Sequence, residues 1–372
     1  MTETHTPAAE WIRDPAILQA LRSDAGPRIG LDTEFIRERT YWPVLALVQI
    51  STPERILLID PRIPGIPEAL REWLDDASIL KVMHSAGEDL IALRQACEAL
   101  PAPLFDTQTA AALAGMGAGL GYQALVREIT GVELAKGETR TDWLQRPLTP
   151  AQCDYAADDV RHLFALHDAL TARLHALGRE AWLEQDCALA IDLAREHRAD
   201  PWPHLGVRAA QVLDRPAQTR LLRLLRWRDR RAVERNLPRN WVIAPELAID
   251  LARLDPADHA GVSALLARVP KAPQSLADAI TRALTTAVDD EAHMPLVIDD
   301  RNRDRRQLQA LQAAVAKRSS ELELPDGVLA SRRILQAWQD TGAWPDTVSA
   351  WRRSELDALM AAANAKAETA NA

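Results

Sequence analysis

The stretch "IGLDTEFIRERT", residues 29–40, carries two acids inside an apolar run. The apolar residues predict a β-strand over residues 28–35, although strand interiors are usually poor in acids. Side chains two residues apart on a strand point to the same face, so Asp32 and Glu34 share one side of it. Two neighbouring carboxylates repel each other unless a cation lies between them, which makes the pair a candidate site for Mg²⁺ or Mn²⁺. The alternative is a strand whose acids simply face solvent.

The segments around this stretch predict a mixed α/β domain. Three strands joined by short polar breaks, as in antiparallel hairpins, are expected at residues 28–35, 41–50 and 55–60. A short buried strand is expected at residues 79–83, and helices are expected at residues 66–76, at residues 85–100 and from residue 149 onward. Hairpin strands followed by alternating helices and strands indicate a mixed sheet flanked by helices.

The bulk composition indicates a soluble intracellular protein of two or three domains. The 372 residues carry a net charge of −9, which excludes a uniformly basic nucleic-acid-binding protein but leaves room for a local basic face. The three cysteines are scattered and form no CxxC pair, which is typical of reduced thiols. The N-terminus does not resemble a signal peptide, and no apolar run is long enough to span a membrane. We therefore expect a cytoplasmic location.

A third acid lies at the start of the helix expected over residues 85–100. Leu90, Leu93 and Cys97 form an apolar stripe along this helix, and Asp89 falls at the edge of the stripe. Asp89 is also in the first turn, where the helix dipole favours an anion, so it is either an ordinary helix-start acid or an inward-facing one. Glu88 stands three residues after Ser85 and is expected to complete a capping box with it.

A fourth acid lies on the helix that begins at Thr149. A stripe of leucines runs through Leu163, Leu166, Leu170, Leu174 and Leu177. Extended backward at helical spacing, this stripe passes through Asp159 and Tyr155 but misses Asp158. A carboxylate that faces the interior is costly unless it is hydrogen-bonded or binds a metal ion, and both explanations are open for Asp159.

Together these patterns place four inward-facing carboxylates on one strand and two helices of one domain: Asp32, Glu34, Asp89 and Asp159. Four acids can hold two divalent ions. A site with two metal ions stabilises the attacking and leaving oxygens when a phosphodiester is cleaved. The residues alone thus predict metal-dependent phosphodiester chemistry.

The order Asp-x-Glu, a later Asp, and then Tyr-x-x-x-Asp resembles the tyrosine-bearing branch of the DEDD superfamily of 3′-to-5′ exonucleases. Three longer segments are most similar to the ribonuclease D family: "GLDTEFIRERTYWPVLALVQIS", "KVMHSAGEDL" and "TDWLQRPLTPAQCDYAADDVRHL". The resemblance covers about residues 10–200. It implies a ribonuclease-H-like fold, two metal ions bound by the four acids, and Tyr155 as the residue that orients the attacking water.

Three residues beside these motifs are candidates for contact with the terminal nucleotide: Phe35, Gln49 and His84. An aromatic ring can stack on a base. The alternative for each is packing or support of the neighbouring acids. His162 stands seven residues after Tyr155, which is the wrong offset for the base of the histidine-bearing branch, so we interpret it as structural.

The C-terminal half is expected to be helical and resembles HRDC domains. Residues 199–206 look like a linker, and amphipathic helical stretches follow over residues 216–286 and 304–362. We therefore predict an exonuclease domain at residues 1–205, followed by two all-α HRDC-like domains at residues 206–295 and 296–372, the last with a frayed tail.

A local basic segment lies in the first of these helical regions. Residues 216–240 hold eight arginines against two acids, a net charge of +6, with Trp227 and Trp241 among them or just beyond. Basic residues with aromatic neighbours suit single-stranded nucleic acid, and Arg226 and Arg230 are our candidate contacts. The alternative is a solvated helix face with tryptophans in its core.

The function expected from this resemblance is a metal-dependent 3′-to-5′ exoribonuclease that uses two Mg²⁺ or Mn²⁺ ions. It would trim tRNA precursors and other structured RNAs and release nucleoside 5′-monophosphates, acting as a monomer. Two alternatives remain open. One is a DNA exonuclease, because no residue identifies itself as a reader of the RNA 2′-hydroxyl. The other is a non-catalytic RNA-binding protein with a degenerate nuclease domain.

Overall fold

The computed structural model describes residues 8–135, 137, 141–255, 257–269, 274–298 and 305–370. Its centre is a six-stranded mixed sheet in the order β1-β4-β3-β2-β5-β6. The strands are β1 (Ala9–Ile12), β2 (Arg28–Ile36), β3 (Val44–Ser51), β4 (Ile56–Ile59), β5 (Leu80–Met83) and β6 (Leu104–Asp106). β2, β3 and β4 form an antiparallel meander, while β1, β5 and β6 join it in parallel. The predicted mixed sheet is confirmed.

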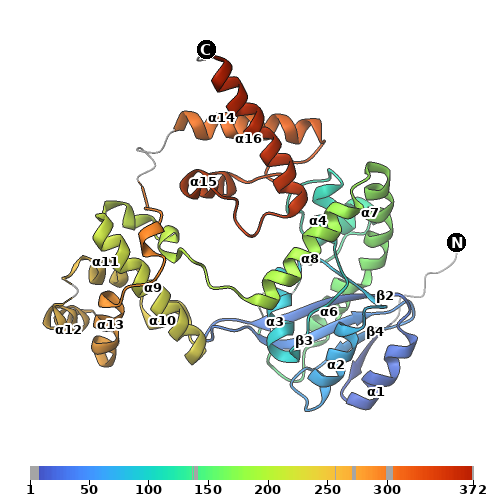
Figure 1. The fold of residues 1–372 in the computed structure, drawn as a ribbon. Helices are drawn as coiled ribbons and strands as arrows, with labels where there is room; N and C mark the ends of the chain where they lie inside the picture. Colours follow the sequence, from blue (N-terminus) through green and yellow to red (C-terminus); the bar gives the residue numbers. More distant parts are fainter. Residues whose placement is uncertain are drawn as a thin grey trace.

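Helices cover both faces of the sheet (Figure 1). They are α1 (Pro15–Leu21), α2 (Ile66–Asp75), α3 (Gly87–Cys97), α4 (Thr107–Leu113), α5 (Tyr122–Thr130), α6 (Pro150–Arg161), α7 (Leu163–Leu177) and α8 (Glu180–Glu196). α3 packs against β2 and β3 from one side, and the Thr33 hydroxyl donates a hydrogen bond to the Asp89 carboxylate of α3. From the other side α6 packs on β2, β3 and β4, and the Ser51 hydroxyl donates to the Val160 carbonyl at 3.0 Å. Alternate residues of β2 therefore face different helices.

Two local predictions about these helices need correction. Ser85 and Glu88 do not form a capping box, because α3 begins at Gly87 and Ser85 has a left-handed φ of 60°. Instead the Asp106 carboxylate accepts from the backbone N–H groups of Ser85 and Ala86. The helix that begins after Thr149 is also not continuous: a capping box between Thr149 and Gln152 starts it, but α6 ends at Arg161 and α7 starts after His162.

The β2–β3 pairing contains a bulge beside Glu34. Glu34 pairs with Leu47 and Phe35 pairs with Leu45, so Ala46 has no partner in this ladder. A bulge bends the strand locally and redirects the side chains on either side of it. This irregularity is therefore placed where it sets the direction of one of the predicted metal ligands.

The first part of the C-terminal half forms a module with a core of its own. Its helices are α9 (Arg215–Arg235), α10 (Arg239–Val242), α11 (Pro245–Arg253), α12 (His259–Arg268) and α13 (Ala277–Thr285). The connection from β2 to β3 inserts Tyr41 into this core. The Trp42 N–H donates to Asn236 at 3.0 Å, and Arg239 donates to the Tyr41 hydroxyl at 3.1 Å. The segment that follows Glu34 thus joins the sheet to the first helical module.

The last helices pack against the α/β domain. They are α14 (Arg305–Glu321), α15 (Arg332–Thr341) and α16 (Ala350–Ala370). Their buried side chains, Leu329 and Leu356 among them, belong to the main core. Trp351 stacks on Trp182 of α8 with ring centroids 4.2 Å apart, and its indole N–H donates to Asp186 at 3.0 Å. The predicted helical C-terminal half is confirmed, while the boundaries at residues 205 and 295 stay predictions.

In the described ranges, no helix has the length and apolar character needed to cross a membrane.

Candidate active site

Three of the four predicted carboxylates meet where β2 passes under α6. Asp32 and Glu34 project from the same face of β2, and Asp159 comes from the last turns of α6. One carboxylate oxygen from each of these three residues lies within 4.8 Å of the other two. All three side chains are half-buried. The spacing of two on the strand and the leucine stripe on the helix thus selected side chains that the structure brings together, and their role as metal ligands stays a prediction.

Asp89 approaches this trio from the opposite helix layer. It lies in the first turn of α3, is 8% exposed, and accepts a hydrogen bond from the Thr33 hydroxyl. In the described structure its oxygens lie outside the group formed by the other three acids. Its charge nevertheless helps to raise the pKa of Asp32, so it lies at the edge of the same site. Thr33 was missed by sequence reasoning, although its position between the two strand acids turns it toward α3.

Burial and mutual repulsion make the charged form of these acids unfavourable. Burial is the largest cause and raises the pKa of Asp32 well above its usual range; the nearby Asp89, Asp159 and Glu34 raise it further. Burial raises the pKa of Glu34 to about 8, and it raises those of Asp89 and Asp159 to about 7. An all-oxygen donor set of this kind fits a hard divalent cation, whose charge would allow the acids to ionise together.

Tyr155 stands one helical turn before Asp159 and is also half-buried. Burial, followed by the charges of Asp159, Glu34 and Asp32, raises its pKa, so the phenol keeps its proton. Its ring lies 6.0 Å from that of Trp143, centroid to centroid. A protonated phenol beside the carboxylates can donate or accept a hydrogen bond at this site.

The three predicted nucleotide contacts occupy different environments. His84 is half-buried, and its Nδ1 lies 2.9 Å from the Thr107 hydroxyl. Because that hydroxyl donates to the Met83 carbonyl, the imidazole N–H is the donor to Thr107. Phe35 packs at the margin of the main core. Gln49 is fully buried and lies directly across the β2–β3 ladder from Asp32, on the same face of the sheet. Contact of these three residues with substrate stays a prediction.

Tyr122 is a further residue near the site that sequence reasoning missed. Its hydroxyl donates to the Asp158 carbonyl at 2.9 Å and accepts from the His162 N–H at 3.3 Å. Tyr122 thus joins the end of α6 to the start of α7. Burial raises the pKa of its phenol, and the charges of the nearby Asp159 and Asp32 raise this pKa further. Nothing in the glycine-rich segment before Tyr122 signals this position.

The two predicted arginine contacts differ sharply. Arg226 makes two hydrogen bonds to the Asp290 carboxylate, at 2.6 and 2.8 Å, and its Nε and Nη2 both donate to the Pro201 carbonyl. Arg223 is likewise paired with Glu291 at 2.6 Å. These acids lie outside the window in which the charge was counted, so part of the local positive charge is neutralised in the fold. Arg230 is exposed.

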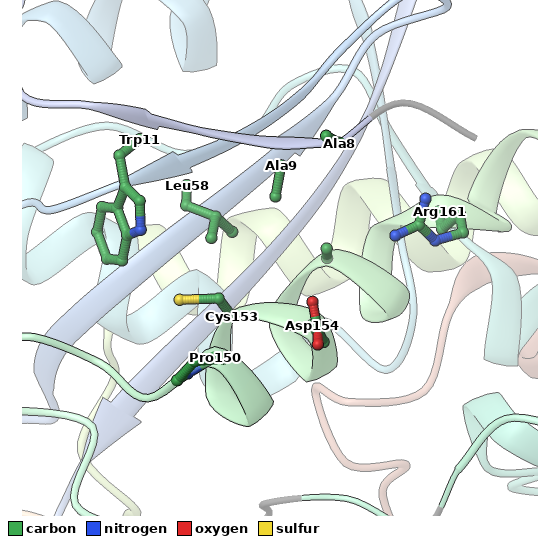
Figure 2. Close-up of a pocket in the computed structure, with 9 residues that line it drawn as sticks. Ala8, Ala9, Trp11, Leu58, Pro150, Cys153, Asp154 and Arg161 are labelled. Carbon is green, nitrogen blue, oxygen red and sulfur yellow. The ribbon is translucent and has the colours of Figure 1, made fainter. Parts of the chain in front are cut away.

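A pocket between the edge strand β1 and α6 lies apart from this carboxylate group (Figure 2). Trp11 and Leu58 form one wall, and Cys153 and Asp154 form the other. Asp154 precedes Tyr155 and is the one carboxylate among the lining residues. None of the trio lines this pocket, so it lies behind α6 rather than over the carboxylates.

The comparisons with known proteins agree with this geometry. Residues 3–175 match a family described as 3′-5′ exonuclease. The chain is 52% identical to ribonuclease D of Xanthomonas oryzae pv. oryzae over 351 residues, which cover 94% of this chain and 97% of that protein. The chain belongs to the ribonuclease D family. Ribonuclease D of Pseudomonas paraeruginosa is 36% identical and covers 94% of this chain and 96% of its own length.

A solved ribonuclease D shares the whole architecture. The crystal structure of RNase D from Escherichia coli, described as an exoribonuclease involved in structured RNA processing, matches with a TM-score of 0.80 and 30% identity. The match covers 95% of this chain and 98% of that chain. The predicted family, the ribonuclease-H-like exonuclease domain and the 3′-to-5′ exoribonuclease activity are thereby confirmed. Assignment of the helical modules to HRDC domains stays a prediction.

The two adjacent acids at the end of α6 offer a matched test. Asp159→Ala removes one of the three grouped carboxylates, and we expect kcat to fall by at least about 100-fold, the upper end of the loss for a supporting residue of a metal site. Asp158→Ala removes a pair with Arg161 at 2.8 Å, worth about 0.3–0.5 kcal/mol, and a charge that raises the pKa of Asp159. It leaves the three grouped carboxylates in place, so its rate should stay near that of the parent. Single-turnover hydrolysis of a 5′-labelled RNA measures both. Equal rates for the two variants would contradict the assignment.

The raised pKa values predict a pH-dependent stability in EDTA. The folded protein binds more protons than the unfolded chain between the ordinary pKa values of these acids, near pH 4, and their folded values of about 7 to 8. The free energy of unfolding should therefore fall as pH rises through this window. Melting curves at about pH 5 and pH 8.5 should show a lower Tm at the higher pH, and saturating Mg²⁺ should raise Tm more there.

Glu34→Gln should make this pH dependence shallower, because it removes one of the acids. Glu38→Gln, an exposed acid two residues past the end of β2, is the matched control and should leave the dependence unchanged. A Tm that is independent of both pH and Mg²⁺ would show that the acids do not compete for protons and cations as described.

Proposed function

We propose that this exoribonuclease uses two divalent ions, Mg²⁺ or Mn²⁺, to trim the 3′ ends of tRNA precursors and other structured RNAs. Its products would be nucleoside 5′-monophosphates and a shortened RNA with a 3′-hydroxyl. The observation that carries this proposal is the close grouping of Asp32, Glu34 and Asp159 with Asp89 beside them. Because these acids and Tyr155 all come from one chain, we also propose that the monomer is the active form.

The carboxylates would be the ligands of the metal ions. When bound, two divalent ions stabilise the attacking and leaving oxygens of an in-line phosphoryl displacement. Asp32 and Glu34 are held by the paired backbone of β2, and Asp89 is held by the Thr33 hydroxyl. Ligands fixed in this way need little rearrangement, which favours a defined geometry at the scissile phosphate.

Tyr155 would orient the attacking water. Its phenol is protonated, so its oxygen can accept a hydrogen bond from a water molecule or its O–H can donate to one. Because the hydroxyl lies on the same face of α6 as Asp159, it can fix a water beside the carboxylates. Tyr155 would therefore orient the attacking water. Its raised pKa argues against a role as the base that removes a proton from that water.

The proposed substrate is RNA with a free 3′ end. The E. coli relative is described as an exoribonuclease involved in structured RNA processing, and the match covers 98% of that chain. A gel time course on a 3′-extended tRNA transcript and a matched DNA strand, each with Mg²⁺, Mn²⁺ or EDTA, tests the proposal. We expect stepwise loss of 3′ nucleotides from the RNA only when a metal ion is present. Equal or faster cleavage of the DNA would contradict the proposed substrate, and cleavage in EDTA would contradict the metal requirement.

Arg230 is the proposed contact with the RNA backbone in the first helical module. It is exposed on α9, whereas Arg226 is held by Asp290. Arg230→Ala should weaken RNA binding and reduce the salt dependence, by about 0.7 in the slope of log K against log salt for each single-strand phosphate that is no longer neutralised. Arg253→Ala, an exposed arginine already paired with Asp250, is the control. An unchanged slope in Arg230→Ala would remove this residue from the binding surface.

A further inference from the structure

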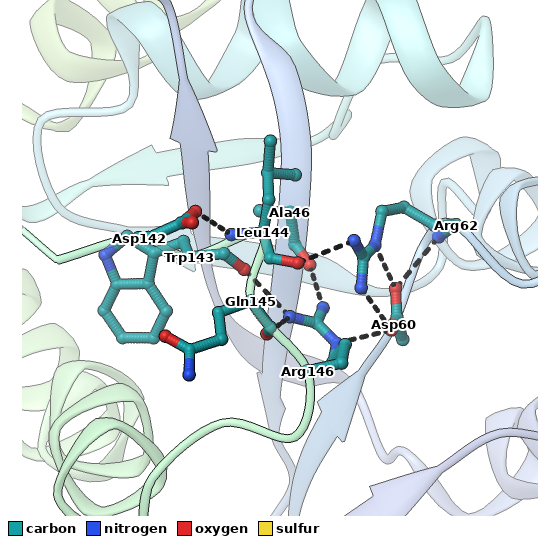
Figure 3. Close-up of polar contacts among 8 residues, drawn as sticks. All are labelled: Ala46, Asp60, Arg62, Asp142, Trp143, Leu144, Gln145 and Arg146. Carbon is teal, nitrogen blue, oxygen red and sulfur yellow. Dashed lines mark hydrogen bonds and ion pairs between the residues drawn. The ribbon is translucent and has the colours of Figure 1, made fainter.

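One guanidinium ties the loop before α6 to the central sheet (Figure 3). Arg146 donates from Nε to the Asp60 carboxylate at 2.6 Å and from Nη2 to the Ala46 carbonyl at 2.6 Å. Its Nη1 donates to the carbonyls of Trp143 and Gln145, both at 2.8 Å. All three of its nitrogens are thus used, and their acceptors come from β3, from the residue that follows β4, and from the loop itself.

Asp60 is the anchor of this network. It is 8% exposed and also accepts hydrogen bonds from Arg62, whose Nη1 donates in turn to the Leu144 carbonyl at 2.9 Å. Burial alone would raise the pKa of Asp60, but the hydrogen bonds from Arg62 and Arg146 outweigh burial and lower it to about 2. The carboxylate therefore stays ionised at any pH well above 2.

At one end the network contacts Ala46, at the β-bulge beside Glu34. Ala46 is the residue that the β2–β3 ladder leaves unpaired, opposite the step between Glu34 and Phe35. A buried carbonyl without a ladder partner needs another donor, and Arg146 supplies it. The guanidinium thereby fixes the bulge that sets the direction of Glu34.

At the other end the network reaches the neighbour of Tyr155. Trp143 is 2% exposed and packs in a small apolar cluster with Leu47, Leu148 and Ala156, and Tyr155 lies against this cluster. Arg146 holds the backbone carbonyl of Trp143, and the two aromatic rings are 6.0 Å apart. The loop that Arg146 anchors therefore sets the position of the Trp143 indole. The indole in turn limits, on one side, the space available to the Tyr155 phenol.

We propose that Arg146, anchored by Asp60, is a positioning residue for the exonuclease reaction: it fixes Tyr155 through Trp143 and Glu34 through the Ala46 bulge. This inference rests on the proposed function, in which Tyr155 orients water and Glu34 binds metal. A residue that only stabilised the fold would change the amount of folded enzyme. A positioning residue lowers the rate of the folded enzyme, and its effect depends on the residue it positions.

A double-mutant cycle separates these two roles. Arg146→Met removes the donors, and Tyr155→Phe removes the hydroxyl that Arg146 is proposed to position. We expect Arg146→Met to lower kcat by about 10- to 100-fold, the range for supporting residues of metal sites, with KM changed much less. In the Tyr155→Phe background the same substitution should lower kcat by a smaller factor than in the parent, because only the part that acts through Glu34 remains. Arg146→Lys should recover part of the rate, because an ammonium can reach one acceptor but cannot reproduce the planar fork.

The control is Arg55→Met. Arg55 pairs with Glu10 at 3.0 Å across the sheet edge, with both side chains about half exposed, so its loss should leave kcat and its coupling to Tyr155 unchanged. Urea unfolding of each variant establishes that the assayed protein is folded. Where Arg146→Met does not fold, Arg146→Lys and Trp143→Phe take its place in the cycle.

Binding of Mn²⁺ followed by calorimetry gives a readout other than activity. Arg146→Met should bind Mn²⁺ several-fold more weakly than the parent if the bulge directs Glu34, and Arg55→Met should bind it as the parent does. Unchanged Mn²⁺ affinity would overturn the connection to Glu34. Independent, multiplicative losses in kcat, or a lower urea midpoint with normal kcat, would overturn the connection to Tyr155. If Tyr155→Phe alone has normal kcat, the role of Tyr155 in the proposed function fails instead.

Discussion

Carboxylates repel one another, and this chain gathers three of them within 4.8 Å and keeps a fourth beside them. Burial adds to the repulsion, so the pKa of Glu34 rises to about 8 and those of Asp89 and Asp159 to about 7. No arrangement of flexible side chains would hold such a group together, because each acid would turn toward solvent. The rest of the fold can be understood as the support that prevents this.

Each acid has a support of a different kind. Asp32 and Glu34 are fixed by the pairing of β2 with β3, and the bulge at Ala46 adjusts the direction of Glu34. Asp89 is held by the Thr33 hydroxyl from the reverse side of that strand. Asp159 depends on α6, whose start is fixed by a Thr149–Gln152 capping box and whose end is joined to α7 through Tyr122. The acids therefore come from three separate elements, β2, α3 and α6, and the packing of both helices on the sheet brings them together.

The sequence predicted the parts of the site that follow from local periodicity. Alternation along β2 was enough to place Asp32 and Glu34 on one face, and the leucine stripe selected Asp159 over Asp158 even though the helix breaks at His162. The family resemblance then supplied the roles that we propose for these residues. The mixed sheet and the helical C-terminal half followed from the same kind of pattern.

The features that sequence reasoning missed depend on residues far apart in the chain. The Ser85 cap was wrong because Asp106, about twenty positions later, binds those N–H groups. The charge count over residues 216–240 could not include Asp290 and Glu291, which neutralise two of its arginines. The network of Arg146 joins Ala46 and Asp60 to a loop some hundred residues away, and no local pattern marks such a contact. Contacts of this kind are decided by tertiary packing alone.

The stacking of Trp351 on Trp182 also has a consequence for the order in which the protein can be completed. The main core contains Leu18 from the beginning of the chain and Leu356 from near its end, while the first helical module, synthesised between them, has a separate core. A ribosome delivers the chain from its N-terminus, and contacts between distant segments form slowly. The exonuclease domain therefore waits with part of its apolar surface uncovered until the last helices emerge, whereas the module between them can fold beforehand.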